Sequence, residues 1–146
     1  MDNKRKYFGV SLIGLMGLFF IITTAFAEVS VKDANDWLSS KATAAPKVDL
    51  TGKWDAGSAW NGGWGEGNFF QEKASFNGSL GMYNVKGVVS GTDLYLVLTS
   101  NDWVYYTAKM SRQSDGSFTG KATKETLVDS KAAESAETWV ITFSKM

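Results

Sequence analysis

The sequence predicts an all-β fold, an eight-stranded antiparallel up-and-down β-barrel preceded by a short helix. Two observations predict it: from Lys47 onward apolar and polar residues alternate in eight short segments, and brief turn-like connections join most of them. The segments are residues 48–55, 68–72, 75–83, 85–90, 93–99, 102–110, 117–123 and 137–144. An open β-sandwich is the alternative, because regularly spaced short strands are typical of both architectures.

Residues 1–27 have the layout of a secretory signal peptide. The basic residues 4–6 precede an apolar run over residues 7–22, and the small residues before Glu28 fit cleavage near Ala27. We therefore expect an exported protein, periplasmic or extracellular, with no stable membrane insertion after cleavage. An uncleaved anchor is the alternative, but the run is shorter than the ~20 apolar residues that span a bilayer.

Cleavage leaves 119 of the 146 residues, the size of one domain, with 12 basic and 14 acidic side chains. We divide this part into a helix and linker (28–46) and a barrel domain (47–146). The chain has no His and no Cys, which excludes a Ser-His-Asp triad, a thiol nucleophile, disulfides, haem attachment and zinc sites built from those residues. The chain is nearly neutral and therefore lacks the excess of basic residues that is typical of nucleic-acid-binding proteins. We expect no enzyme activity, cofactor, metal or nucleic-acid partner.

The acidic residues do not suggest a catalytic pair. Asp93, Asp102, Asp115 and Asp129 lie at or near predicted turns, where Asp commonly accepts hydrogen bonds from the backbone. Glycosidase chemistry needs two carboxylates held a few ångströms apart, and no spacing here indicates such a pair.

Residues 30–42 predict the helix. Ser30 fits an N-cap with Asp33 three positions later, as in a capping box. An apolar stripe at helical spacing contains Val31, Ala34, Trp37, Leu38 and Ala42. Isolated helices of this length are marginal, so we expect it to pack on the barrel, with a disordered leader as the alternative. Residues 43–46 then form a linker that ends at Pro46.

Two segments of the strand region allow alternative predictions. Asn77-Gly78 fits either a position inside a strand or a two-residue hairpin turn, in which case residues 79–90 form one long strand. Residues 125–136 are polar and rich in Ala, which favours a helix by propensity, although a long loop fits as well.

The first predicted strand contains Leu50-Thr51-Gly52-Lys53-Trp54. This Gly-x-Trp motif resembles the opening of calycin barrels, the group of the lipocalins and avidins. The resemblance implies that Gly52 and Trp54 belong to the closed end of the barrel, where Trp54 packs across the opening. It also implies that a basic residue near the last strand, here Lys145, lies over the Trp54 ring as a cation. Of the Asn and Ser that hold biotin in the first loop of avidins, only Ser58 stands near the corresponding place, in a shorter spacing, so biotin binding does not follow.

Residues 57–67 form a loop dominated by Gly and Trp. Two Trp side chains on such a loop can form an apolar platform with N–H donors, suited to a ring-shaped ligand at the barrel mouth. The alternative is that these side chains fold back and seal the barrel. The predicted ligand-binding residues are Trp60, Asn61, Trp64, Glu66, Asn68 and Trp103.

The predicted hairpin of residues 94–99 and 103–110 is apolar on both faces. In the first strand the three leucines lie on one face, and Tyr95 and Val97 lie on the other. In the second strand Trp103 and Tyr105 lie on one face, and the other face carries Val104, Tyr106, Ala108 and Met110. The face outside the barrel needs a cover, either the helix or a second subunit. The predicted interface residues are Tyr95, Val97, Tyr105 and Tyr106.

The sequence therefore predicts an exported, non-enzymatic binding module for a small apolar or ring-shaped ligand at the barrel mouth. The alternative is a structural or interaction protein that forms a homo-oligomer through the outer aromatic face.

Overall fold

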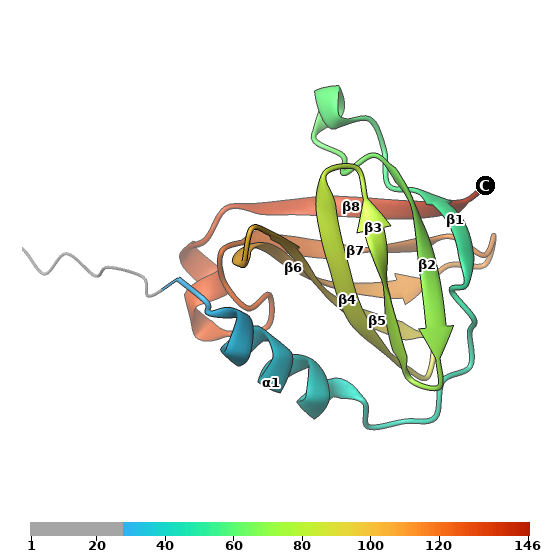
Figure 1. The fold of residues 1–146 in the computed structure, drawn as a ribbon, viewed down its shortest axis with the longest axis horizontal. Helices are drawn as coiled ribbons and strands as arrows, with labels where there is room; N and C mark the ends of the chain where they lie inside the picture. Colours follow the sequence, from blue (N-terminus) through green and yellow to red (C-terminus); the bar gives the residue numbers. More distant parts are fainter. Residues whose placement is uncertain (1–27) are drawn as a thin grey trace, which may run out of the picture.

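The computed structural model describes residues 28–146, which form a closed barrel of eight antiparallel strands with one helix on its outside (Figure 1). The strands follow one another in chain order, and β1 closes on β8. The predicted up-and-down barrel is confirmed, and the open β-sandwich is wrong. The predicted signal peptide, residues 1–27, lies outside the described residues.

The elements are α1 (Val31–Lys41), β1 (Gly52–Asp55), the short 3-10 helix η1 (Ala59–Asn61), β2 (Glu66–Glu72), β3 (Ser75–Leu80), β4 (Tyr83–Ser90), β5 (Asp93–Ser100), β6 (Trp103–Arg112), β7 (Phe118–Lys124), the 3-10 helix η2 (Lys131–Ser135) and β8 (Thr138–Lys145). Between residues 28 and 146, no helix is long and apolar enough to cross a membrane.

Helix α1 lies against the outer face of β4, β5 and β6 (Figure 1). It begins at the predicted cap, where the Ser30 hydroxyl accepts a hydrogen bond from the Asp33 N–H at 3.0 Å. Three residues of the predicted stripe are buried in a cluster that contains Ala34, Trp37, Leu38, Val88, Val97, Val104 and Val128. Val31 is partly buried, and Ala42 is exposed because α1 ends one residue before it. The helix is therefore ordered and covers the face for which we expected either a helix or a second subunit.

One carboxylate fastens α1 to the connection between β7 and β8. Asp129 forms an ion pair with Lys41 and accepts a hydrogen bond from the Trp37 indole N–H at 2.8 Å. Burial by itself would raise the pKa of Asp129, but the hydrogen bonds from Lys41 and Trp37 and the charge of Lys41 lower it below its ordinary value. The helix is thus fixed by a charge as well as by apolar packing.

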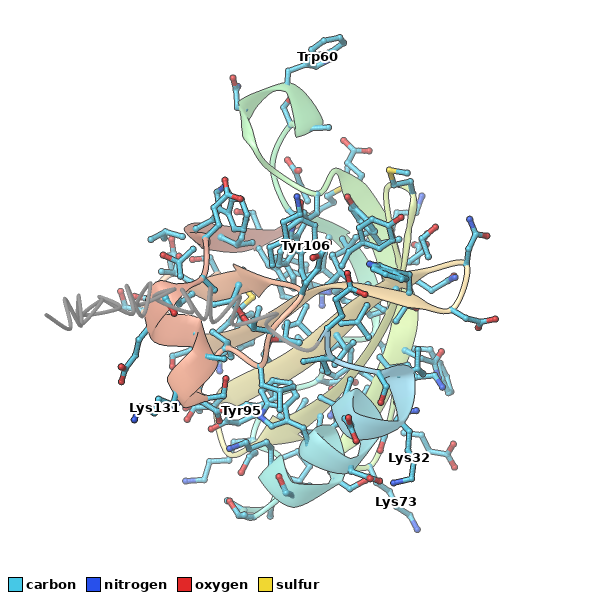
Figure 2. The ribbon with its side chains drawn as sticks, turned by 90° about the vertical axis from the view of Figure 1, so that its left-hand side faces the viewer. Lys32, Trp60, Lys73, Tyr95, Tyr106 and Lys131 are labelled. Carbon is cyan, nitrogen blue, oxygen red and sulfur yellow. The ribbon has the colours of Figure 1, made fainter. Side chains whose placement is uncertain are left out.

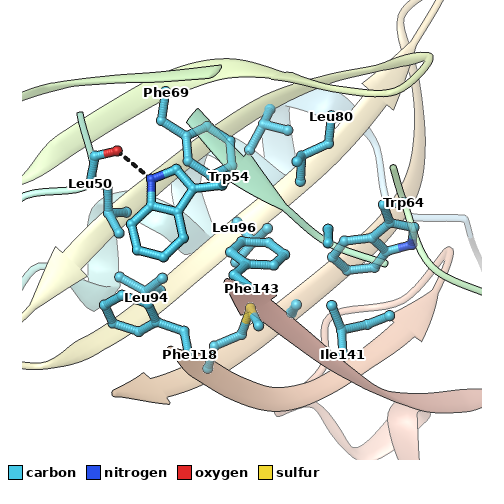
Figure 3. Packing of buried hydrophobic residues seen from close by; sticks show 14 of the residues in the cluster. Leu50, Trp54, Trp64, Phe69, Leu80, Leu94, Leu96, Phe118, Ile141 and Phe143 are labelled. Carbon is cyan, nitrogen blue, oxygen red and sulfur yellow. Dashed lines mark hydrogen bonds between the residues drawn. The ribbon is translucent and has the colours of Figure 1, made fainter. Parts of the chain in front are cut away.

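Side chains fill the interior of the barrel (Figure 3). Leu94, Leu96 and Leu98 of β5 face inward and are fully buried, so Tyr95 and Val97 face α1. The aromatic members of the interior cluster are Trp54, Trp64, Phe69, Phe76, Phe118 and Phe143. Any ligand site of this barrel therefore belongs to an end or an outer face.

The observed strand pairing and loop structure decide between the alternatives that the sequence left open for two segments. Asn77 and Gly78 lie inside β3 and pair with Phe70 and Phe69, so the prediction of a hairpin turn there is wrong. The chain turns instead at Gly81, which has φ +53° and lies between β3 and β4. Residues 125–137 form a loop that contains only the short helix η2.

The predicted faces of β6 are wrong, because this strand contains a β-bulge. Leu98 pairs with Tyr106 while the next residue of β5, Thr99, pairs with Val104, so Tyr105 is an extra residue in β6. An extra residue reverses the alternation of side chains, because successive residues of a strand point to opposite faces. Val104 therefore packs under α1, whereas Tyr106 lies against the barrel interior; we had placed them on the same face.

The buried position of Trp54 predicts a large effect on stability. Replacement of Trp54 by Ala should lower the free energy of unfolding by about 3–5 kcal/mol, through the loss of buried contacts and the cavity that remains. Urea unfolding followed by circular dichroism measures this. Trp60→Ala is the matched control and should change stability by less than about 0.5 kcal/mol, since Trp60 is 96% exposed. Equal effects of the two substitutions would contradict the packing described here. Should Trp54→Ala fail to fold, Trp54→Phe is a milder substitution whose smaller loss of stability can be measured in the same way.

The lowered pKa of Asp129 predicts an acid-sensitive attachment of α1. Its stabilising contribution is present above the ordinary Asp pKa, near 4, and is lost as pH falls through the lower value in the folded protein. The protection of the α1 amides, measured as the hydrogen-exchange rate relative to the intrinsic rate at each pH, should therefore fall on acidification more in the parent than in Asp129→Asn, which lacks the titrating group. Asp36→Asn removes an exposed pair with Lys32 and should retain the acid sensitivity. If Asp129→Asn were as sensitive to acid as the parent protein, Asp129 would not be the group that makes the attachment of α1 depend on pH.

Candidate functional site

The two ends of the barrel differ in their connections. One end, named here the loop end, carries the connections β1–β2, β3–β4, β5–β6 and β7–β8, two of which are long: residues 56–65 and 125–137. The opposite end, named the turn end, carries the connections β2–β3, β4–β5 and β6–β7, and the longest of these is residues 113–117. Because the interior is filled, each end is considered as a candidate site.

An aromatic depression of about 480 Å³ opens at the loop end, and we name it the aromatic mouth. Its lining residues are Ala59, Gly62, Gly63, Trp64, Gly65, Gly81, Met82, Tyr83, Tyr106 and Trp139. Tyr106 is central, with ring centroids 5.4 Å from Trp64, 5.6 Å from Tyr83 and 5.5 Å from Trp139. Its volume falls in the usual range of small-molecule sites, about 300–1,000 Å³.

Backbone contacts of the glycine-rich loop hold Trp64 at this position. The Trp64 N–H donates to the Ala56 carbonyl at 3.2 Å, and the Gly65 N–H donates to the Gly57 carbonyl at 2.8 Å. Gly63 lies against the backbone of Gly57 so closely that a Cβ there would clash. The absence of a side chain at Gly63 thus lets the loop fold back and carry the Trp64 ring into the barrel opening.

The mouth also offers hydrogen-bond donors. The indole N–H groups of Trp37 and Trp54 donate to protein acceptors, but those of Trp64 and Trp139 donate to none of residues 28–146. Figure 3 shows the Trp64 nitrogen directed away from the packed interior, although its residue is only 5% exposed. Burial, followed by the neighbouring Tyr106, raises the pKa of Tyr83, so its hydroxyl stays protonated near neutral pH.

The structure brings some of the predicted ligand-binding residues together. Trp64 lines the mouth, and Trp60 and Asn61 belong to η1 in the loop above it. The Trp60 side chain projects into solvent and is 96% exposed (Figure 2). The predicted platform of two adjacent Trp rings is therefore not formed, because Trp64 folds inward and Trp60 points outward.

The remaining predicted residues do not line the mouth. Glu66 and Asn68 are exposed on β2, where the Glu66 carbonyl accepts a hydrogen bond from Gly81 at the rim. Trp103 is the first residue of β6 and lines a separate depression with residues 28–31. The grouping of Trp103 with Trp60 and Trp64 is not seen in the structure.

Tyr83 and Trp139 belong to the mouth but were not predicted to bind ligand. Each is the first inward-facing residue of a strand that starts at the loop end, β4 and β8 respectively. The alternation of Trp139, Ile141 and Phe143 was visible in the sequence, as was a Tyr two residues before Val85. An aromatic residue at the first inward position of a strand is the signal that could have found them.

The predicted interface residues occupy three different environments. Tyr95 and Val97 lie under α1, where the Trp37 ring packs edge-on against Tyr95 at 5.8 Å. Tyr105 is the bulge residue, with its ring 5.6 Å from that of Tyr83. Tyr106 lines the mouth. While α1 is in place, Val97 is 2% exposed and is not accessible to a second subunit.

The turn end holds the residues of the Gly-x-Trp motif. The Trp54 indole N–H donates to the Leu50 carbonyl at 2.8 Å, and the Lys145 ammonium lies 5.9 Å from the centroid of the Trp54 ring. Gly52 has φ +132°, a conformation that favours glycine, and stands beside the Lys145 side chain. These residues have the arrangement that the resemblance to calycin barrels implied for the closed end.

The described part of the chain contains no group of three acidic side chains that could hold a metal ion. Comparisons with models of protein families, with curated proteins and with solved structures find no match to this chain.

Proposed function

We propose that this protein binds a small, largely apolar ring-shaped ligand in the aromatic mouth. The observation that carries the proposal is the open cluster of Trp64, Tyr106 and Trp139 above a filled interior. Aromatic rings offer a ligand ring both contact area and stacking, worth about 0.5–1.5 kcal/mol for each pair beyond the buried area. The free indole N–H groups then favour a ligand with hydrogen-bond acceptors at its edge.

The residue types that line the mouth support a binding role without catalysis. Its lining residues include no Asp, Glu, Lys or Arg, so the lining supplies no strong general acid or base and no carboxylate nucleophile. We propose further that the protein acts outside the cytoplasm after cleavage near Ala27. The alternative, a homo-oligomer formed through the outer aromatic face, has less support, because α1 covers much of that face.

A binding experiment with two Trp variants tests the proposal. Indole, phenol, methyl glucoside and biotin serve as probes, and the readouts are Trp fluorescence and the indole N–H signals in ¹H–¹⁵N NMR spectra. We expect at least one probe to shift the signals of Trp64 and Trp139 in a saturable way. Trp139→Ala should weaken that binding about tenfold, equivalent to about 1.4 kcal/mol.

Trp103→Ala is the matched control, since it removes a partly exposed Trp at the same end but outside the mouth. It should leave the affinity unchanged. The proposal is wrong if no probe class shifts the two indole signals, or if Trp103→Ala weakens binding as much as Trp139→Ala.

A further inference from the structure

A second depression, of about 500 Å³, lies at the turn end and differs in chemistry from the mouth. Its lining residues are Lys47, Val48, Asp49, Trp54, Arg112, Asp115, Gly116, Ser117, Phe118, Ser144 and Lys145. Trp54 and Phe118 are almost fully buried beneath it, so most of its accessible groups are charged or carry hydroxyls. We name it the cation pocket.

Three cations from separate parts of the chain converge on this pocket. Lys47 precedes β1, Arg112 ends β6 and Lys145 ends β8. The backbone holds the first two near each other, because the Lys47 N–H donates to Gly91 and the Arg112 N–H donates to the adjacent Thr92. The fold therefore brings these residues, which are distant in the sequence, into the lining of one pocket.

None of these cations forms an ion pair at contact distance with a carboxylate of the described residues, although the charge of Lys145 contributes to the lowered pKa of Asp49. Two ion pairs, Lys32–Asp36 and Lys41–Asp129, are present among residues 28–146, and neither contains Lys47, Arg112 or Lys145. Like charges that line one concave site raise the local potential and attract a counter-ion. An anionic group in the pocket would offset their mutual repulsion.

Two carboxylates at the pocket restrict which anion can bind. The Asp49 carboxylate accepts a hydrogen bond from the Thr51 N–H, and the Asp115 carboxylate accepts two from Ser117; in both residues the bonds go to Oδ1. These hydrogen bonds hold both pKa values below the ordinary range, so both groups remain charged near neutral pH. Neither Oδ2 accepts a hydrogen bond from the described residues.

The ligand must therefore combine an anion with hydroxyl donors. Two ionised carboxylates repel a bare anion, but their free oxygens can accept hydrogen bonds from hydroxyl groups. Three cations against two carboxylates leave an excess positive charge, which favours a ligand with net negative charge over a neutral zwitterion. We propose that the cation pocket binds an acidic monosaccharide, with its carboxylate at Lys47, Arg112 and Lys145 and its hydroxyls at Asp49 and Asp115.

An NMR titration with D-glucuronate, D-glucose and acetate tests this proposal. Glucuronate should shift the backbone signals of Ser117 and Lys145 in a saturable way and leave Tyr83 and Trp139, at the opposite end, unchanged. Glucose and acetate should each bind at least about tenfold more weakly, because each lacks one half of the recognised chemistry. Affinity should fall when ionic strength rises from about 0.01 M to about 0.15 M, since the screening length shortens from about 30 to about 8 Å.

Charge variants identify the site. Lys47→Ala and Arg112→Ala should each weaken glucuronate binding about threefold to fivefold, the upper part of the range for exposed ion pairs. Lys121→Ala is the matched control, since Lys121 is exposed on β7 and does not line the pocket. Asp49→Asn should narrow the preference for glucuronate over acetate, because it removes a carboxylate that repels acetate. The Asn side-chain oxygen can still accept the hydrogen bond from the Thr51 N–H, so the local structure is retained.

The proposal is overturned if glucuronate produces no saturable shift at the turn end, or if acetate or glucose binds as tightly. An effect of Lys121→Ala equal to that of Lys47→Ala would reduce the result to general charge attraction and would also overturn it. These outcomes are independent of the probes for the aromatic mouth, because the two sites are read out by residues at opposite ends of the barrel.

Discussion

The closure of β1 onto β8 is the interaction on which the rest of the structure depends. The two strands pair through two positions, Trp54 with Lys145 and Asp55 with Ser144, whereas β4 and β5 pair through seven. A hydrogen bond from the Met146 N–H to Lys53 extends this short seam. The buried Trp54 ring and the cation above it therefore stabilise the closed barrel where the hydrogen-bonded ladder is shortest.

Both candidate sites are consequences of this closure around a filled interior. Strand β8 carries Trp139 to the aromatic mouth at its start and Lys145 to the cation pocket at its end. Because Phe69, Phe118 and Phe143 occupy the space between, a ligand cannot enter the barrel without disrupting its core. The filled interior thus leaves both candidate sites at the barrel ends, where connections and strand termini supply side chains that the core does not need.

The sequence predicted the barrel and the helix cap, because alternation and local motifs are short-range signals. The contact of Lys145 with the Trp54 ring was implied only by the resemblance to calycin barrels. The sequence did not predict the aromatic mouth correctly. Which way Trp64 turns depends on a loop that folds back on Gly57, and the position of Tyr106 depends on a bulge opposite Leu98 and Thr99. Neither is encoded in a local pattern, since a bulge is defined by the partner strand.

The bulge also explains why one aromatic-rich hairpin serves two purposes. If β6 were regular at Tyr105 rather than bulged, Val104 and Tyr106 would share a face, and either the cluster under α1 or the aromatic mouth would lose a member. With the bulge, β6 sends Val104 outward beneath the helix and Tyr106 inward to the mouth. The Tyr105 carbonyl accepts a hydrogen bond from the Glu125 N–H at 2.9 Å, which extends the pairing of β6 with β7 to the point where the long β7–β8 loop begins. A single inserted residue thus links the attachment of the helix, the aromatic mouth and the loop beside it.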